Sequence, residues 1–241
     1  MTLASGKDLL ADAEARGYAV PGFNVSNVEL ALGVLDAAQA KRAPVLLQFN
    51  TSNLDHVGGV EVAGALARAL AGRASTPVAV HLDHGGSVEL LRAAVRAGFT
   101  SLMFDGSKLP YEENVAITAK IVEMASVVGI PVEAELGKVL KSTDNVSEED
   151  VLNAMTKPEQ AVDFVSRTGC DSLAVAIGSV HAMTSAAASL DIERLKAIAA
   201  VVDIPLVLHG SSGVKEESEV EAIQYGIAKI NVATMLNQAF M

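Results

Sequence analysis

The sequence predicts an α/β protein, a (β/α)8 barrel of the TIM type, with residues 1–241 forming a single domain. Eight short apolar runs are separated mostly by helical patterns, and such alternation is typical of parallel strands joined by helical crossovers. The length of 241 residues suits one large α/β domain. Half of the residues are apolar but only 4% are aromatic, so the core must consist mainly of Ala, Val, Leu and Ile. A doubly wound open sheet is the alternative, but Gly58-Gly59 and Gly85-Gly86 lack the spacing of a dinucleotide-binding loop.

Eight strands are expected where short apolar runs end in polar residues, Gly or Pro. In chain order they cover residues 19–24, 45–49, 78–83, 101–105, 131–136, 172–177, 205–209 and 228–232. The run 131–136 alternates in polarity, with Glu133 and Glu135 two residues apart. A strand count of eight in a chain of this length favours the closed barrel.

Helices are expected in most of the gaps between these strands. They cover residues 5–16, 27–41, 58–73, 87–97, 111–128, 159–167, 192–201 and 215–224. Ser26 is the expected N-cap of the second helix, with Glu29 at its third position. Gly98, Gly129 and Gly169 are expected to end the helices that precede them.

Two segments depart from this repeat. Residues 137–157 form a polar stretch rich in Ser, Thr, Asp and Glu, and long polar loops in compact domains are often functional. The sequence ends at Met241, about eight residues into the last expected helix, so we expect that helix to be short or truncated.

Charge and cysteine content narrow the classes of function. A net charge of −11 argues against binding to nucleic acid or to anionic membranes. An anionic substrate would have to be held locally, by backbone N–H groups and a few side chains. The single cysteine, Cys170, precedes an apolar run, so we expect it to be buried and the chain to have no internal disulfide. With no apolar signal region and no run long enough to span a membrane, a cytoplasmic protein is expected.

Reactive side chains gather at the expected carboxyl ends of the strands, where barrels of this kind place their active sites. They are Asn24, Asp83, His84, Asp105, Glu135, His181, His209 and Asn231. The densest group is His81-Leu82-Asp83-His84-Gly85, which directly follows an apolar run. We therefore expect these side chains to meet at one mouth of the barrel, although they are scattered along the sequence.

Three of these histidines, His84, His181 and His209, are candidate ligands of one zinc ion. Neutral imidazoles suit zinc, and three protein ligands leave a coordination position open, which is the catalytic pattern. Asp83 is the candidate general acid/base beside the metal, although a carboxylate in that place could instead orient a ligand histidine. His56 is expected in an exposed loop.

Other polar residues near this group have open assignments. His81 shares a strand face with Asp83, so it could be an outer partner of the site, an alternate metal ligand or a polar core residue. Asp105 and Glu135 could support the ligand histidines or hold a second cation, and Glu133 could share that role.

Two segments of small residues could bind an anion. Gly210-Ser211-Ser212-Gly213 enters a helix, and its N–H groups and hydroxyls could hold a phosphate. Asn231-Val232-Ala233-Thr234 could bind an anion in the same way, at the start of the next helix. Barrels often bind phosphate after strands seven and eight, which favours a phosphorylated ligand.

Six short motifs contain most of these residues. They are His81-Leu82-Asp83-His84-Gly85, Phe104-Asp105-Gly106-Ser107, Glu133-Ala134-Glu135-Leu136-Gly137, Ala176-Ile177-Gly178 through His181, Leu208-His209-Gly210-Ser211-Ser212-Gly213 and Lys229-Ile230-Asn231-Val232-Ala233-Thr234. Together they resemble the class II, zinc-dependent ketose-bisphosphate aldolases, above all the fructose-bisphosphate and tagatose-bisphosphate members. The resemblance extends over residues 23–240, nearly the whole chain.

This resemblance implies a reaction and roles for particular residues. His84, His181 and His209 would bind Zn²⁺, which polarises the ketose carbonyl and stabilises the enediolate left by carbon–carbon cleavage. Asp83 would be the acid/base. The substrate contacts would be Asn24, Ala182, Gly210, Ser211, Ser212, Asn231, Val232, Ala233 and Thr234. Family members are usually homo-oligomers, dimers or tetramers, some with a monovalent cation near the phosphate.

Three departures from the family pattern stand out. Ala182 occupies a position where the family usually has Gly, and Asn50 stands where Ser is usual. After Gly137 the family has a Gly-Gly turn and acidic residues, whereas this chain has Lys138-Val139-Leu140-Lys141-Ser142-Thr143-Asp144. Besides aldol cleavage, the sequence leaves open a metal-dependent hydrolase on the same barrel and a divergent sugar-phosphate binder with weak or no activity.

Overall fold

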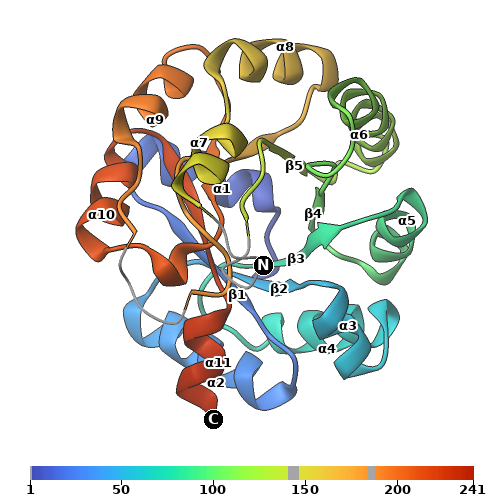
Figure 1. The fold of residues 1–241 in the computed structure, drawn as a ribbon. Helices are drawn as coiled ribbons and strands as arrows, with labels where there is room; N and C mark the ends of the chain where they lie inside the picture. The colour runs from blue at the N-terminus through green and yellow to red at the C-terminus, as the bar shows by residue number, and fades with distance from the viewer. Residues whose placement is uncertain (1, 141–146, 184–187) are drawn as a thin grey trace.

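Eight parallel strands close into a barrel in the computed structural model, which describes residues 2–140, 147–183 and 188–241 (Figure 1). The strands are β1 (Val20–Asn24), β2 (Val45–Phe49), β3 (Val78–Gly85), β4 (Ser101–Phe104), β5 (Val132–Leu136), β6 (Ser172–Val175), β7 (Leu206–Leu208) and β8 (Ile227–Val232). Each strand pairs with the next in sequence, and β8 closes the barrel against β1 through the pairs Val20–Lys229 and Phe23–Val232. The predicted (β/α)8 fold is therefore confirmed.

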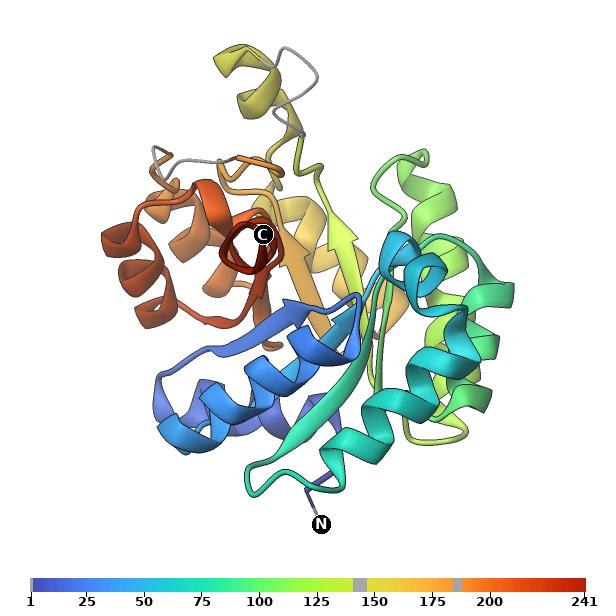
Figure 2. The same cartoon turned by 90° about the horizontal axis from the view of Figure 1, so that it is seen from below.

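Helices surround the barrel and connect its strands (Figures 1 and 2). They are α1 (Gly6–Arg16), α2 (Val28–Lys41), α3 (Thr51–Val57), α4 (Val60–Ala71), α5 (Val88–Ala97), α6 (Tyr111–Ser126), α7 (Glu148–Ala154), α8 (Pro158–Thr168), α9 (Ile192–Ala199), α10 (Glu216–Gln224) and α11 (Thr234–Phe240), with a short 3-10 helix, η2 (Ser211–Gly213). In Figure 2, α7 lies beyond the carboxyl ends of the strands and the N-terminus lies at the opposite end of the barrel.

The amino end of the barrel is apolar and is covered by α1. Leu9, Leu10 and Ala13 of this helix pack with Leu46 and Ala228, which lie inside the barrel on β2 and β8. The Ser5 side chain caps the helix by accepting a hydrogen bond from the Lys7 N–H. This apolar layer closes one end of the barrel and leaves the carboxyl ends of the strands as its open mouth.

The barrel interior above this layer carries polar side chains beside a small apolar cluster of Met103, Ala174 and Val207. Gln48, His81, Glu133 and Lys229 are almost completely buried there. Apolar side chains on the strands pack outward against the helices in two large clusters, one centred on the α2–α5 side and the other on the α8–α10 side. The hydrophobic core that holds the fold together is thus the layer between strands and helices, while the inside of the barrel is free to carry polar groups.

Helix boundaries follow the predictions in most places, with two corrections at caps. Asn27, not Ser26, caps α2, because the Asn27 side chain accepts from the Leu30 N–H at 2.8 Å. Gly98 and Gly169 cap their helices in left-handed conformations, as predicted. Helix α6 ends at Ser126, before the predicted stop at Gly129.

Two helices lie in segments without a predicted helix. Helix α3 carries the exposed His56, and Asn50 and Asn53 form a capping box at its start. Helix α7 lies inside the polar stretch 137–157, while residues 141–146 of that stretch, including Asp144, lie outside the described residues. No helix in the described ranges combines the length and the apolar character needed to cross a membrane.

Candidate active site and metal centre

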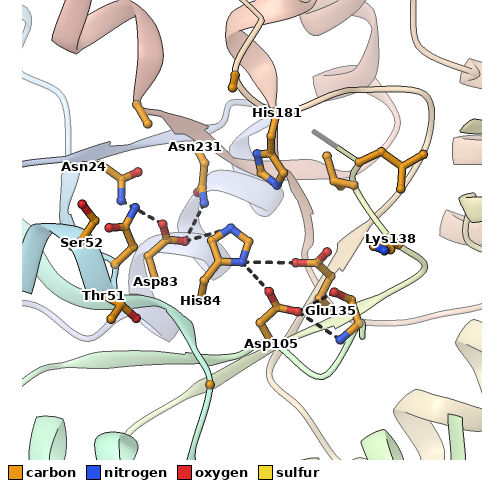
Figure 3. Close-up of a pocket in the computed structure, with 18 of the residues that line it drawn as sticks. Asn24, Thr51, Ser52, Asp83, His84, Asp105, Glu135, Lys138, His181 and Asn231 are labelled. Atoms are coloured by element: carbon orange, nitrogen blue, oxygen red, sulfur yellow. Dashed lines mark hydrogen bonds and ion pairs between the residues drawn. The ribbon is translucent and has the colours of Figure 1, made fainter. Parts of the chain in front are cut away.

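A cavity of about 790 Å³ opens at the carboxyl ends of the strands. It is lined by side chains from several strands and loops, with Asn24, Asp83, His84, Asp105, Glu135, His181 and Asn231 directed toward its centre (Figure 3). Most of the residues that the sequence analysis singled out are therefore brought together, although the loops that carry them are far apart in sequence.

A bulge in strand β3 turns the His84 side chain into this cavity. Strict alternation along the strand would send neighbouring side chains to opposite faces, so Asp83 and His84 could not both face inward. The register between β3 and β4 shifts between Leu82 and Gly85, and His84 has a left-handed φ of 47°. Gly85 permits this bend, since a Cβ there would lie 2.6 Å from the Met103 carbonyl oxygen. Asp83 and His84 consequently line the same cavity.

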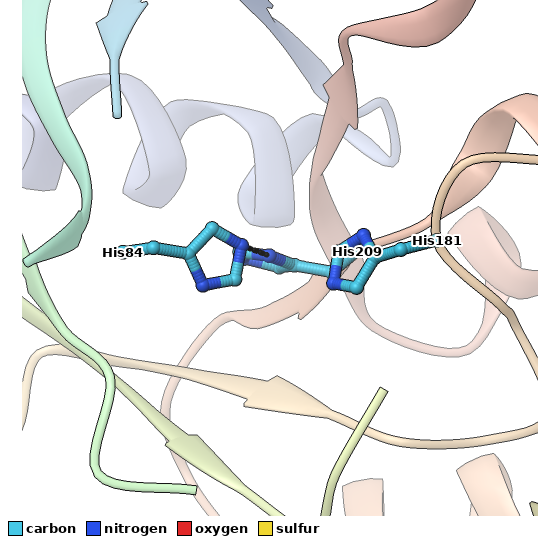
Figure 4. A group of neighbouring side chains, drawn as sticks. All are labelled: His84, His181 and His209. Atoms are coloured by element: carbon cyan, nitrogen blue, oxygen red, sulfur yellow. Dashed lines mark hydrogen bonds between the residues drawn. The ribbon is translucent and has the colours of Figure 1, made fainter. Parts of the chain in front are cut away.

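The three candidate zinc ligands converge at one point. Ligand atoms of His84, His181 and His209 all lie within 4.8 Å of one another (Figure 4). His84 Nε2 and His209 Nδ1 are 3.1 Å apart. Two nitrogens bound to the same tetrahedral zinc ion would be about 3.3 Å apart, from zinc–nitrogen bonds of about 2.05 Å. The spacing of these two rings therefore fits a shared ion.

Carboxylates hold two of these rings by their other nitrogens. The Asp105 carboxylate lies 2.9 Å from His84 Nδ1, and the Glu133 carboxylate lies 2.8 Å from His209 Nε2. Because a carboxylate can only accept, each ring carries a proton on that side and turns its other nitrogen toward the shared point. Carboxylate–histidine pairs of this kind are common around protein-bound zinc.

The electrostatics of the mouth favour positive charge. Burial lowers the pKa of His84, but the carboxylates of Asp83, Asp105 and Glu135 outweigh burial and raise it to about 10. Burial lowers the pKa of His209 well below its usual value, and the positive charges of its neighbours add to this effect. The carboxylates around His84 therefore favour positive charge at this point.

Asp83 is held at the centre of the mouth by two amides. Its oxygens accept hydrogen bonds from Asn24 Nδ2 at 2.9 Å and from Asn231 Nδ2 at 3.1 Å. Burial raises the pKa of this carboxyl, but the positive charges of His84 and Lys229 and the hydrogen bond from Asn24 outweigh burial and hold it below the usual value. Asp83 is thus buried, oriented and ionised beside the three imidazoles.

Asp105 and Glu135 form a second possible ligand group with His84. The Glu135 Oε2 atom is buried and, among the described residues, accepts no hydrogen bond, although it lies 3.6 Å from His84 Nδ1. Burial raises the pKa of Glu135 to about 8, and the nearby charges of Asp105 and Glu133 contribute. The possible metal ligands around His84 therefore include carboxylate oxygens, and a second cation position would lie between His84, Asp105 and Glu135.

His81 lies deeper in the barrel than the cluster of three imidazoles. Its Nδ1 is 2.8 Å from Ser101 Oγ and its Nε2 is 3.2 Å from Lys229 Nζ. In the described part of the chain, neither group of candidate metal ligands includes it. Both ring nitrogens of His81 are engaged, which favours the role of a buried outer partner over that of an alternate ligand.

The small-residue turns lie on one side of the cavity. The lining residues there are Ala182, Gly210, Ser211, Ser212, Asn231, Ala233 and Thr234. Gly210 has a φ of 70°, and a Cβ on it would lie 3.0 Å from the Val180 carbonyl carbon, so the turn requires glycine. Val232 does not line the cavity, because its side chain packs against the apolar core. Ala182 has a left-handed φ of 61°, which is unusual for a residue with a Cβ.

Gln48, Asn53 and Lys229 support the site but received no role in the sequence analysis, although Lys229 begins one of the six motifs. Gln48 and Asn53 both hold the Asn24 side chain. Gln48 Nε2 donates to Asn24 Oδ1 at 3.3 Å, and Asn24 Nδ2 donates to Asn53 Oδ1 at 3.2 Å. Lys229 donates to Glu133 at 2.6 Å inside the barrel. A signal was available for two of them, since Gln48 and Lys229 interrupt otherwise apolar strands.

Comparison with known proteins gives one consistent result. Residues 4–241 match the sequence profile of the family described as fructose-bisphosphate aldolase class-II. The YdjI aldolase of Escherichia coli K12 has a similar structure, with a TM-score of 0.87 and 40% identity over 98% of this chain and 83% of that one. A candidate fructose-1,6-bisphosphate aldolase of Coccidioides immitis has the same TM-score and coverage at 32% identity. The fructose-bisphosphate aldolase of Campylobacter jejuni has a TM-score of 0.82 and 26% identity, over 99% of this chain and 79% of that one.

Proposed function

The chain belongs to the class II fructose-bisphosphate aldolase family of carbon–carbon lyases, and we propose that it reversibly cleaves a ketose 1,6-bisphosphate with the help of zinc. The products would be dihydroxyacetone phosphate and glyceraldehyde 3-phosphate. Fructose 1,6-bisphosphate is the first candidate substrate and tagatose 1,6-bisphosphate the second. The observation that carries this proposal is the convergence of three imidazoles at one point beside a buried carboxylate, where His84, His181 and Asp83 line the cavity and His209 lies buried behind its wall.

The residues present suit a divalent ion. His84, His181 and His209 would hold it, because two of these rings already turn one nitrogen to a common point while carboxylates hold their other nitrogens. When bound, the ion supplies Lewis acidity, which withdraws electron density from a carbonyl oxygen of the substrate. The imidazoles are neutral ligands, so the positive charge of the ion remains available for this purpose.

Asp83 would move the proton. Cleavage of an aldol requires removal of a proton from the hydroxyl of the departing aldehyde, and condensation requires its return. Asp83 is held in the ionised form, and its hydrogen bonds to Asn24 and Asn231 leave each oxygen with further accepting capacity. The two amides fix the carboxylate next to the imidazoles, where the reacting carbon atoms would lie.

The two ends of the cavity suit a substrate with two phosphates. The backbone and hydroxyls of residues 210–212, with Asn231, Ala233 and Thr234, would hold the phosphate of the dihydroxyacetone portion. Lys108 and Lys138 also line the cavity and could pair with the phosphate of the aldehyde portion. Such local groups are needed in a chain with a net charge of −11.

One observation favours a second candidate, a sugar-phosphate binder with weak or no aldolase activity. Ala182 places a methyl group in a left-handed residue on the cavity wall, beside the turn proposed to bind phosphate. A methyl group there could displace the phosphate enough to slow the reaction. Binding of a bisphosphate without turnover would support this reading.

The decisive experiment pairs metal analysis with cleavage assays on both bisphosphates. We expect about one zinc per chain, activity that is lost on chelation and restored by zinc, and loss of bound zinc in a His84→Ala variant. His56→Ala is the matched control, because that histidine is exposed on α3, away from the cavity lining. Full activity after exhaustive chelation, or zinc binding unaffected by His84→Ala, would refute the proposed metal centre.

We also propose that the enzyme works in the cytoplasm as a homo-oligomer. The single cysteine and a phosphorylated substrate are consistent with that compartment. Light scattering coupled to size-exclusion chromatography would test the assembly, and a monomeric mass at micromolar concentration would contradict it.

A further inference from the structure

A line of five buried side chains crosses the interior of the barrel below the three imidazoles. It runs from Ser101 on β4 to His81 on β3, then to Lys229 on β8, Glu133 on β5 and finally His209, which follows β7. The successive distances are 2.8 Å, 3.2 Å, 2.6 Å and 2.8 Å. The side chains of His81, His209 and Lys229 are 0% exposed and that of Glu133 is 2% exposed.

The direction of each hydrogen bond follows from the groups involved. An ammonium can only donate, so Lys229 donates to both Glu133 and His81 Nε2. His81 must then carry its proton on Nδ1 and donate to Ser101 Oγ. Glu133 can only accept, so His209 donates from Nε2 and leaves Nδ1 unprotonated, facing His84 Nε2 at 3.1 Å. The line is thus an ordered chain of donors and acceptors with one positive and one negative charge.

Glu133 depends on Lys229 for its orientation. One of its oxygens accepts from His209 and the other accepts from Lys229 at 2.6 Å. The Lys229 ammonium is the only charged amine that the structure gives as a hydrogen-bond donor to this carboxylate among the described residues. Without it, a buried oxygen would lose its donor, and the carboxylate would be free to turn away from His209.

Resting on the proposed function, we infer that Lys229 is a positioning residue for the metal centre: through Glu133 it fixes the His209 tautomer whose Nδ1 faces the ion. In the described part of the chain, the hydrogen bonds of Lys229 go to His81 and Glu133, and Lys229 does not line the cavity. It acts indirectly, through Glu133, so its replacement should weaken metal binding. Loss of an outer partner of a metal-bound histidine typically weakens metal binding about 10- to 100-fold.

The test measures zinc affinity by competition with a chromogenic chelator. Lys229→Met keeps the length of the side chain and removes its charge, and we expect it to weaken zinc binding about 10- to 100-fold. Glu133→Gln should weaken zinc binding by a similar factor, because an amide facing both Lys229 and His209 cannot accept from both with equal geometry. Thr118→Val is the control, since it removes a buried hydrogen bond, to Asn114 on α6, outside the barrel interior.

A purely structural role predicts a different pattern. It would lower the melting temperature of the zinc-free protein in all three variants and leave the zinc dissociation constant unchanged. Wild-type zinc affinity in a folded Lys229→Met or Glu133→Gln protein would overturn the inference. Wild-type protein that binds no zinc through its histidines would overturn the proposed function as well, so the two failures are distinguishable.

A measurement on the wild-type protein keeps the inference testable if both variants fail to fold. In the zinc-loaded protein, nitrogen-15 correlation spectra of the imidazoles report which nitrogen of His209 carries the proton. We expect the proton on Nε2 and the metal on Nδ1. A His209 ring protonated on Nδ1 would overturn the inference without any substitution.

Discussion

Ala182 offers a sharp test of the site, because its backbone is strained where the substrate is proposed to bind. Its φ of 61° lies in the left-handed region, which glycine occupies without cost. We predict that Ala182→Gly stabilises the protein and lowers the KM for a ketose bisphosphate, since the change relieves the backbone and removes a methyl group from the cavity wall.

The expected gain in stability can be worked from the backbone alone. A left-handed conformation costs a residue with a Cβ about 1–2 kcal/mol. The greater freedom of glycine in the unfolded chain offsets about 0.5–1 kcal/mol of the gain. The net stabilisation is therefore about 0–1.5 kcal/mol, with a midpoint of about 0.75 kcal/mol that raises the melting temperature of a chain of this size by about 1.5–3 °C.

Arg42 provides the matched control for this experiment. It is the C-cap of α2, exposed, with a left-handed φ of 53°, and lies at the end of the barrel opposite the cavity. Arg42→Gly should raise the melting temperature by a similar amount, measured by circular dichroism, and leave KM unchanged. A stabilised Arg42→Gly beside an Ala182→Gly protein with unchanged or lower melting temperature would refute the strain argument. An unchanged KM in Ala182→Gly would show that the Ala182 methyl group does not hinder substrate binding.

Three further predictions follow from single side chains. Asp83→Asn should lower kcat/KM about 10²- to 10⁴-fold while zinc content stays constant, and near-normal turnover would disprove the proton-transfer role. Gly64→Ala should destabilise the protein by about 1–3 kcal/mol in urea titrations, because its Cβ would lie 2.4 Å from the Ala97 carbonyl oxygen between α4 and α5. Cys170 is buried, and burial raises its pKa to about 11, so a thiol reagent at pH 8 should react with it only after unfolding. Rapid labelling of the native protein would contradict that burial.

The sequence alone predicted most of the site because the barrel imposes a simple rule. All eight parallel strands end at the same mouth, so a reactive residue just after any apolar run must lie near the others. His84, His181 and His209 are far apart along the chain, yet this rule is enough to place them together. The rule needs only the positions of the strand ends, which apolar runs mark well.

Local features such as a bulge, a short helix and a helix cap could not be predicted in this way. Period-two alternation cannot predict the bulge that turns His84 inward, because the bulge depends on the pairing between β3 and β4. Helix α3 has only seven residues, and its capping box uses two asparagines rather than the Ser/Thr and Glu/Gln of the usual motif. The cap of α2 was misplaced by one residue, because Ser26 and Asn27 are both good cap residues and only the backbone geometry distinguishes them.

The buried pair of Lys229 and Glu133 shows a deeper limit. Each residue is visible in the sequence as a charge inside a strand, but their contact joins β8 to β5 across the barrel. No periodicity within either strand encodes that pairing. It follows from barrel closure, which brings side chains from non-neighbouring strands to the same interior level.

The arrangement of charge in the barrel explains how an acidic chain can serve an anionic substrate. Inside the barrel, Lys229 neutralises Glu133, so the interior adds no net charge beneath the site. At the mouth, Asp83, Asp105 and Glu135 surround His84 and favour a bound cation. A divalent ion bound by neutral imidazoles would then offset this negative charge and place a local positive charge at the reacting centre. Attraction for a sugar phosphate would therefore be concentrated at the reacting centre, so removal of the ion should weaken substrate binding as well as turnover.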